Sequence, residues 1–191
     1  MSLRIAIPTD FSPPAEKAAR YILELLRGEP CVFFLVHTYT PSFFRAEYLI
    51  HSPGQIGLGD FYKERVMRKL KKFREALAPY ADADQHEFYT HAAFNNLDDE
   101  LNDMAKKEAL DLIAMGTQGA TGAREVLFGT HAVQVLHKAR IPVLVVPAAA
   151  RAGEIQDVLF PTDYKPDYSR LRLQALLGVL QQTGAKVHIL H

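Results

Sequence analysis

Two apolar runs near the start of the chain constrain its fold more than any other feature. They are LRIAIP, residues Leu3 to Pro8, and CVFFLVH, residues Cys31 to His37. Both are apolar over most of their length rather than at alternate positions, which is typical of strands in a parallel sheet covered on both faces. Between them, Ser12 and Pro13 stand at the N-cap and first position of a helix with apolar residues at helical spacing. The opening of the chain therefore predicts a β-α-β unit.

The same alternation continues to about residue 147. Further strands are expected at 86–91, 110–116 and 141–147, and further helices at 60–80, from Asn96 onward, and at about 130–139. Strands that alternate with helices indicate an α/β fold, here an open parallel sheet of five strands with helices on both faces.

The sequence after residue 154 repeats the opening of the chain. Pro8-Thr9-Asp10 returns as Pro161-Thr162-Asp163, and the histidine that ends the second run, His37, returns as His191. A repeat at about a domain length indicates tandem modules. We therefore expect a complete module over 1–147, a linker over 148–154, and an incomplete β-α-β repeat over 155–191. A lone unit of this kind cannot bury both faces of its strands, so it should pack on the first module or on a second chain.

Composition excludes several classes of partner. Lys and Arg together number 22, as do Asp and Glu, so no overall field favours nucleic acid or an anionic membrane. No apolar stretch approaches the ~20 residues that span a bilayer, and the single cysteine, Cys31, fits a reducing compartment. A cytoplasmic location is expected. The eight histidines do not predict a metal site, because pairs such as His86 and His91 lie an odd number of residues apart on strands and so face opposite ways.

The segment MGTQGATGAREVLFGTHA, residues 115–132, follows the fourth predicted strand and is rich in glycine. In open parallel sheets, ligands bind beyond the carboxyl ends of the strands, where the strand order reverses. If the first and fourth strands are neighbours, Asp10 and this segment face one crevice. With Thr130 as the cap of the next helix, the segment predicts an anion site, most plausibly for phosphate. It matches neither a P-loop nor the dinucleotide fingerprint.

Gly116-x-x-Gly119, nine residues and then Gly129-Thr130 resemble the Gly-2x-Gly-9x-Gly-Ser/Thr nucleotide motif of the universal stress protein family. PTDFSPPAEKAARYI near the start and ARIPVLVVP after the motif also resemble that family. The resemblance covers residues 4–147, and 155–191 resemble the opening third of a second copy. It implies the strand order 3-2-1-4-5 and an adenine nucleotide, usually ATP, with or without Mg²⁺.

Carried over position by position, the resemblance assigns roles to individual residues. Pro8, Thr9 and Asp10 would flank the adenosine, with Asp10 accepting a hydrogen bond from ribose or adenine. The Val36 backbone would bind the base, and Met115 and Gly116 would line the pocket. The phosphates would contact Gly119, Gly129, Thr130 and the amide of His131, whose side chain departs from the small or aliphatic residue common in the family. The residues alone leave open that Asp10 serves the first helix and that the glycines only permit turning.

Three functions follow from these observations. The first is an ATP-binding stress-response sensor or adaptor, working as a homodimer or as a pseudo-dimer between modules. No general base aimed at a γ-phosphate is evident, so at most slow hydrolysis is expected. The second is a stress protein that acts through protein contacts with an empty pocket, its surface lying in 40–59. The third is an ATP-dependent activating enzyme, for which the chain shows no substrate-binding base or lysine. A phosphoacceptor receiver domain would need paired acids after the first strand, where Asp10 stands alone.

Overall fold

The computed structural model describes residues 2–39, 58–117, 129–151, 153, 155–163 and 170–191. Its first sheet is parallel, with five strands in the order β3-β2-β1-β4-β5. These strands are β1 (Leu3–Pro8), β2 (Cys31–Thr38), β3 (His86–Ala93), β4 (Leu112–Gly116) and β5 (Val143–Val146). The α/β fold and the strand order expected from the sequence are confirmed.

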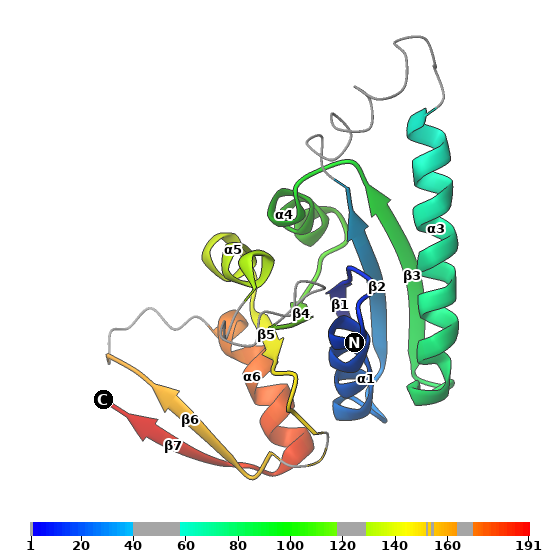
Figure 1. Cartoon of the computed structure of the whole chain (residues 1–191). Helices are drawn as coiled ribbons and strands as arrows, with labels where there is room; N and C mark the ends of the chain where they lie inside the picture. Colours follow the sequence, from blue (N-terminus) through cyan, green and yellow to red (C-terminus); the bar gives the residue numbers. More distant parts are fainter. Residues whose placement is uncertain (1, 40–57, 118–128, 152, 154, 164–169) are drawn as a thin grey trace.

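Helices cover both faces of this sheet (Figure 1). They are α1 (Pro13–Leu25), α3 (Leu58–Leu77) with the short η1 (Ala78–Tyr80), α4 (Leu97–Lys107) and α5 (Thr130–Lys138). One core packs α1 and α3 against alternate residues of β1 and β2, including Ile5, Phe33 and Leu35. A second core packs α4 and α5 against the opposite faces of the same strands, including Ala6 and Phe34. Two cores account for the nearly continuous apolar runs, since both faces of each central strand are buried.

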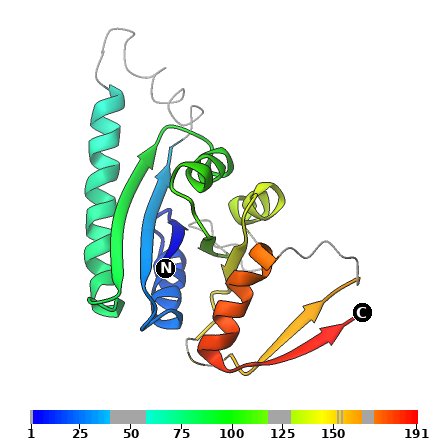
Figure 2. The same cartoon turned by 180° about the vertical axis from the view of Figure 1, so that it is seen from behind.

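The end of the chain forms a second, two-stranded parallel sheet. Its elements are β6 (Asp157–Pro161), α6 (Arg170–Thr183) and β7 (Lys186–Leu190). Figures 1 and 2 show this unit on the β5 side of the molecule, away from β3 and α3. All five residues of β7 are exposed, so the first module does not bury this strand. Packing against a second chain, the other half of the expectation, stays a prediction.

Several element ends differ from the sequence prediction. The fourth strand begins at Leu112 rather than 110, the fifth covers only Val143–Val146, and the helix expected from 60 begins at Leu58. Asn96 is the N-cap of α4 as predicted, but its side chain donates to Asp99 at 3.3 Å instead of capping a backbone amide. Within the described residues, no helix is long and apolar enough to cross a membrane.

Candidate functional site

A cavity of about 390 Å³ opens at the carboxyl ends of β1, β2 and β4. This volume lies within the range of small-molecule sites in proteins. Its wall contains eight of the residues predicted from the sequence: Pro8, Thr9, Asp10, Met115, Gly116, Gly129, Thr130 and His131. The structure therefore brings the end of β1 and the two ends of the glycine segment into one crevice. Gly119 lies outside the described residues.

The turn between β1 and α1 fixes Asp10 at the mouth of this cavity. The Thr9 Oγ1 accepts from the Phe11 amide at 3.0 Å, and the Asp10 Oδ1 accepts from the Ser12 amide at 3.0 Å. Ser12 then caps α1 by accepting from the Ala15 amide at 3.3 Å. Asp10 is nevertheless exposed. Its carboxylate thus helps to fold the turn while the residue also lines the cavity, so the two roles left open by the sequence are compatible.

The end of β2 contributes two residues beyond the predicted one. Val36 is fully buried, its carbonyl accepts from the Thr9 amide at 2.9 Å, and it is not among the residues that line the cavity. His37 and Thr38, which follow it, do line the cavity. Backbone groups alternate in direction along a strand, so Thr38 directs its backbone to the same side as Val36. Because β1 ends at Pro8, that side of Thr38 lies beyond the paired part of β1.

Helix α5 presents an open N-terminus to the cavity. The N-cap is Gly129, not Thr130 as predicted, and no side chain caps it among the described residues. The Gly129 amide is itself occupied, donating to the Thr117 carbonyl at 2.7 Å, and the first intrahelical bond is from Val133 to Gly129. Thr130, His131 and Ala132 therefore occupy the positions whose amides have no intrahelical acceptor. These amides and the helix dipole make an anion-binding end, and the first turn carries no acidic residue.

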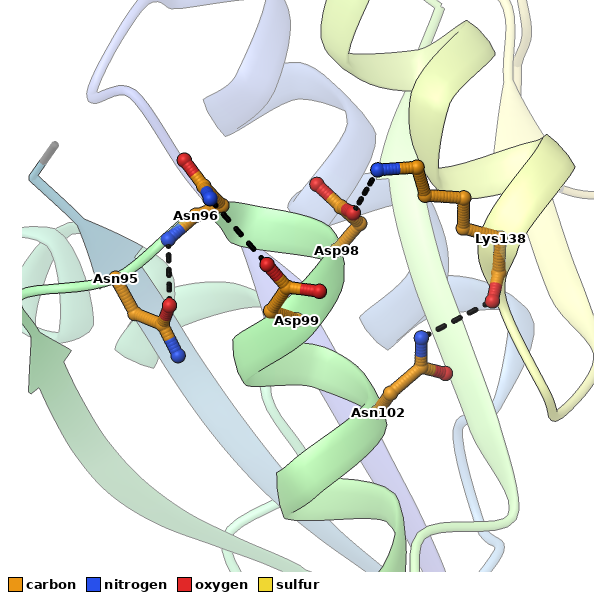
Figure 3. Close-up of polar contacts among 6 residues, drawn as sticks. All are labelled: Asn95, Asn96, Asp98, Asp99, Asn102 and Lys138. Atoms are coloured by element: carbon orange, nitrogen blue, oxygen red, sulfur yellow. Dashed lines mark hydrogen bonds and ion pairs between the residues drawn. The ribbon is translucent and has the colours of Figure 1, made fainter.

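Polar contacts from α4 fix the other end of α5 (Figure 3). The Lys138 Nζ lies 2.7 Å from the Asp98 Oδ2, and the Asn102 amide donates to the Lys138 carbonyl at 3.0 Å. The Asn102 Oδ1 also accepts from the Arg140 amide at 3.0 Å. The paired carboxylate of Asp98 raises the pKa of Lys138, so its ammonium stays charged. These contacts hold the helix whose N-terminus lines the cavity.

The profile of the universal stress protein family matches residues 1–147. The chain belongs to this family. A universal stress protein of Methanocaldococcus jannaschii is 28% identical over 144 residues, which cover 75% of this chain and 81% of that protein. A solved universal stress protein of Archaeoglobus fulgidus matches with a TM-score of 0.64 at 19% identity, over 97% of this chain and 64% of that one. Another, solved in complex with cAMP, matches with a TM-score of 0.55 at 14% identity, over 78% and 98%. The two structural likenesses support the fold.

Six residues of the cavity wall in this universal stress protein were not predicted: Ala15, His37, Thr38, Leu97, Thr117 and Ala132. Three of them, Ala15, Leu97 and Ala132, are apolar, and an apolar position on a cavity wall cannot be told from a core position in the sequence. His37 is different, because it belongs to the internal repeat of the sequence. Pro8-Thr9-Asp10 and His37 return as Pro161-Thr162-Asp163 and His191. That recurrence was the available signal.

Burial shifts the pKa of two side chains on strand β2 of this universal stress protein, Cys31 and His37. Burial raises the pKa of the Cys31 thiol to about 12, so it remains protonated at neutral pH and is not a nucleophile. Burial lowers the pKa of His37 below its ordinary 6.5, and the Lys69 ammonium acts in the same direction. The hydrogen bond to Thr9 and the charge of Asp10 oppose this shift without reversing it. His37 is therefore neutral at pH 7.

Proposed function

We propose that the crevice binds an adenine nucleotide, ATP with Mg²⁺, and that the chain acts as a stress-response sensor or adaptor rather than a fast enzyme. The observation that carries the proposal is the meeting of the Pro8-Thr9-Asp10 turn with the uncapped N-terminus of α5 in one cavity. Membership of the universal stress protein family and the cAMP complex of a relative support a nucleotide as the ligand.

The phosphates would bind at the α5 end of the cavity. The amides of Thr130, His131 and Ala132 would donate to phosphate oxygens, and Gly129 would allow close approach of the chain. Gly119, on the predicted motif, would complete this cradle. Mg²⁺ would be held chiefly by the phosphates themselves, which is its usual mode in nucleotide sites.

The nucleoside would extend from β4 across β1 toward β2. Adjacent strands lie about 4.8 Å apart, so the ends of β4 and β2 are separated by about 10 Å, a span that suits a base at one end and phosphates at the other. Asp10 would accept from a ribose hydroxyl or from adenine. We assign the backbone contact to the base to Thr38 in addition to Val36, because Thr38 lines the cavity and the Val36 carbonyl already accepts from Thr9.

The described part of the cavity wall offers little for catalysis. Its titratable side chains are Asp10, His37 and His131, and Asp10 and His37 are both engaged in the β1–α1 turn. A fast hydrolase needs a base within hydrogen-bond reach of the attacking water, at the γ-phosphate. We therefore expect at most slow ATP hydrolysis, and signalling through the bound state.

Thermal unfolding with and without Mg-ATP tests the proposal. Ligand at about 100 times its dissociation constant adds about 2.7 kcal/mol, which for a chain of this length raises Tm by roughly 5–10 °C. Magnesium alone should give no shift, and Mg-GTP and cAMP measure selectivity. No shift with Mg-ATP and no nucleotide retained through purification would instead favour a protein that works through contacts with other proteins. Of the segment 40–59 expected to carry such contacts, residues 40–57 lie outside the described residues, and the last two begin α3.

A charge variant tests the anion site without weakening the helix. Thr130→Glu places a carboxylate in the first turn of α5, where it repels phosphate but favours the helix dipole. We expect at least a tenfold loss of Mg-ATP affinity with no loss of Tm. Gln134→Glu adds the same charge one turn later on an exposed position and should leave the affinity nearly unchanged. Equal losses in both variants would point to overall charge rather than to a local phosphate site.

We further propose that residues 1–147 and 155–191 are separate modules joined by 148–154, and that the chain forms a homodimer or pairs its modules as a pseudo-dimer. The exposed strand β7 supports this, since an uncovered apolar strand is costly to leave in water. Size-exclusion chromatography with light scattering measures the assembly. A monomer whose tail is rapidly cut by protease would contradict the dimer.

A further inference from the structure

The turn that carries Asp10 contains a strained residue. Phe11 has a φ of 64°, in the left-handed region that side chains other than glycine rarely adopt. A non-glycine residue in this conformation is strained, so the surrounding structure must hold it in place. Strain of this kind concentrates at binding and catalytic sites, and this turn lies on the wall of the candidate nucleotide site.

His37 holds the turn from the end of β2. Its Nδ1 lies 2.7 Å from the Thr9 carbonyl oxygen, and its ring centre lies 4.5 Å from that of Phe11. A carbonyl only accepts hydrogen bonds, so Nδ1 carries the proton. Because His37 is neutral at pH 7, Nε2 then carries none.

Helix α3 holds Phe11 as well. The Phe73 ring meets Phe11 edge-on at 6.1 Å, and the Lys69 ammonium lies 5.4 Å from the centre of the Phe11 ring. Contacts from β2 and from α3 thus fix one side chain, and the two local bonds to Thr9 and Asp10 fold the backbone around it. Among the side chains that contact the turn from β2 and α3 in the described structure, His37 bonds directly to the turn's backbone, in addition to the bond from the Thr9 amide to the Val36 carbonyl.

The second repeat contains the counterparts of Thr9, Asp10 and His37. Pro161 pairs with Leu190 as Pro8 pairs with Val36, and the Thr162 amide donates to the Leu190 carbonyl at 2.9 Å, as the Thr9 amide does to Val36. His191 therefore stands in the same position relative to its Thr-Asp pair as His37 does. Between the repeats the paired strands differ in most residues, while Thr, Asp and His are shared. This recurrence indicates that the three residues work as a unit.

We propose that His37 is a positioning residue of the nucleotide site, and that its Nδ1–H bond to the Thr9 carbonyl and its packing on Phe11 hold the left-handed turn that presents Asp10 to the ligand. This inference rests on the proposed function and adds a residue to it. His37 acts through the turn rather than on the reacting or binding atoms themselves.

Isothermal titration with Mg-ATP, on the full chain, tests the inference. His37→Leu removes the donor and should weaken binding about tenfold. His37→Asn places an amide donor near the position of Nδ1 and should bind within about threefold of the natural chain. His191→Leu, the same substitution in the second repeat, should leave affinity unchanged. His37→Leu that binds as tightly as the natural chain, or His37→Asn that binds as poorly as His37→Leu, overturns the inference.

Two further measurements on the unsubstituted chain do not depend on the folding of a variant. Nitrogen-15 NMR of the His37 ring should show the Nδ1–H tautomer at pH 7, and the Nε2–H tautomer would overturn the inference. Amide hydrogen exchange should show protection at Phe11 and Ser12 without nucleotide. A natural chain that binds no Mg-ATP contradicts the proposed function itself, whereas binding that is indifferent to His37 contradicts only the role given to His37.

Discussion

The two β-α-β units of the chain have the same strand register and opposite surroundings. In the first unit, β2 is buried from Cys31 to Val36, and in the second, β7 is exposed along its whole length. The pairing of Pro8 with Val36 and of Pro161 with Leu190 makes Leu35 and Ile189 equivalent positions. Leu35 is 0% exposed and Ile189 is 63% exposed.

This difference separates what a local sequence determines from what the rest of the fold determines. The strand, the Pro-Thr-Asp turn and the closing histidine are enough to give parallel pairing in both units. Burial in the first unit comes from α3, α4, α5 and the flanking strands, which the second unit lacks within the described chain. Pairing is therefore a local property here, and a hydrophobic core is not.

The largest expected effect on stability comes from substituting the two equivalent residues, Leu35 and Ile189. Leu35→Ala removes a fully buried side chain and should lower the free energy of unfolding by about 3 kcal/mol, through lost transfer energy and a cavity. At a protein concentration low enough for the chain to be monomeric, Ile189→Ala should change it by no more than about 0.5 kcal/mol, as an exposed position does. Denaturant unfolding followed by circular dichroism measures both.

The control for this comparison is protein concentration. If Ile189→Ala costs as much as a core substitution, β7 is covered in solution, and the loss should grow as the chain is concentrated because a second chain provides the cover. A large loss that is independent of concentration would contradict both the exposed strand and cover by a second chain.

The sheet could be predicted from the sequence because its signals are local and repeated. The apolar runs at 3–8 and 31–37 gave strand bounds within a residue, and the resemblance to the universal stress protein family gave the order of strands. Helix ends were harder, since Gly129 and Thr130 are both acceptable caps and only the backbone angles distinguish them.

The composition of the cavity wall was only partly predictable, for a physical reason. Residues from β1, β2, β4, α4 and α5 meet there, and their relative depth depends on register rather than on residue type. The step from Val36 to Thr38 is such a case, because strand end and pairing partner decide which backbone group reaches the crevice. Polar residues such as Asp10 were found because their chemistry stands out in an otherwise apolar region.

An intermediate effect is expected from two polar side-chain pairs of the same length. Asp98 and Lys138 are 2.7 Å apart with the carboxylate 6% exposed, and Asp157 and His188 are 2.7 Å apart with side chains 62% and 58% exposed. Asp98→Ala removes a buried acceptor and should cost about 1 kcal/mol, while Asp157→Ala should cost little, since exposed pairs contribute weakly. Thermal unfolding at low and at 1 M salt measures both. Equal costs for the two variants would mean that burial does not distinguish the pairs.

The smallest expected effect is the change in the free energy of unfolding as the pH falls below neutrality. Because the folded state lowers the pKa of His37 below 6.5, the unfolded chain takes up this proton first as the pH falls. The contribution of neutral His37 to stability is therefore complete above pH 6.5 and decreases below it, until the pH reaches the pKa of the folded state. His37→Asn does not titrate, so the difference between the two unfolding curves from pH 7.5 to 5.5 isolates this proton from the other histidines. A natural chain that gains stability relative to His37→Asn on acidification would mean that the folded state favours the imidazolium. In that case the Asp10 carboxylate, rather than burial and Lys69, would dominate the pKa of His37. The turn would then be held by an ion pair between His37 and Asp10 instead of by a neutral imidazole.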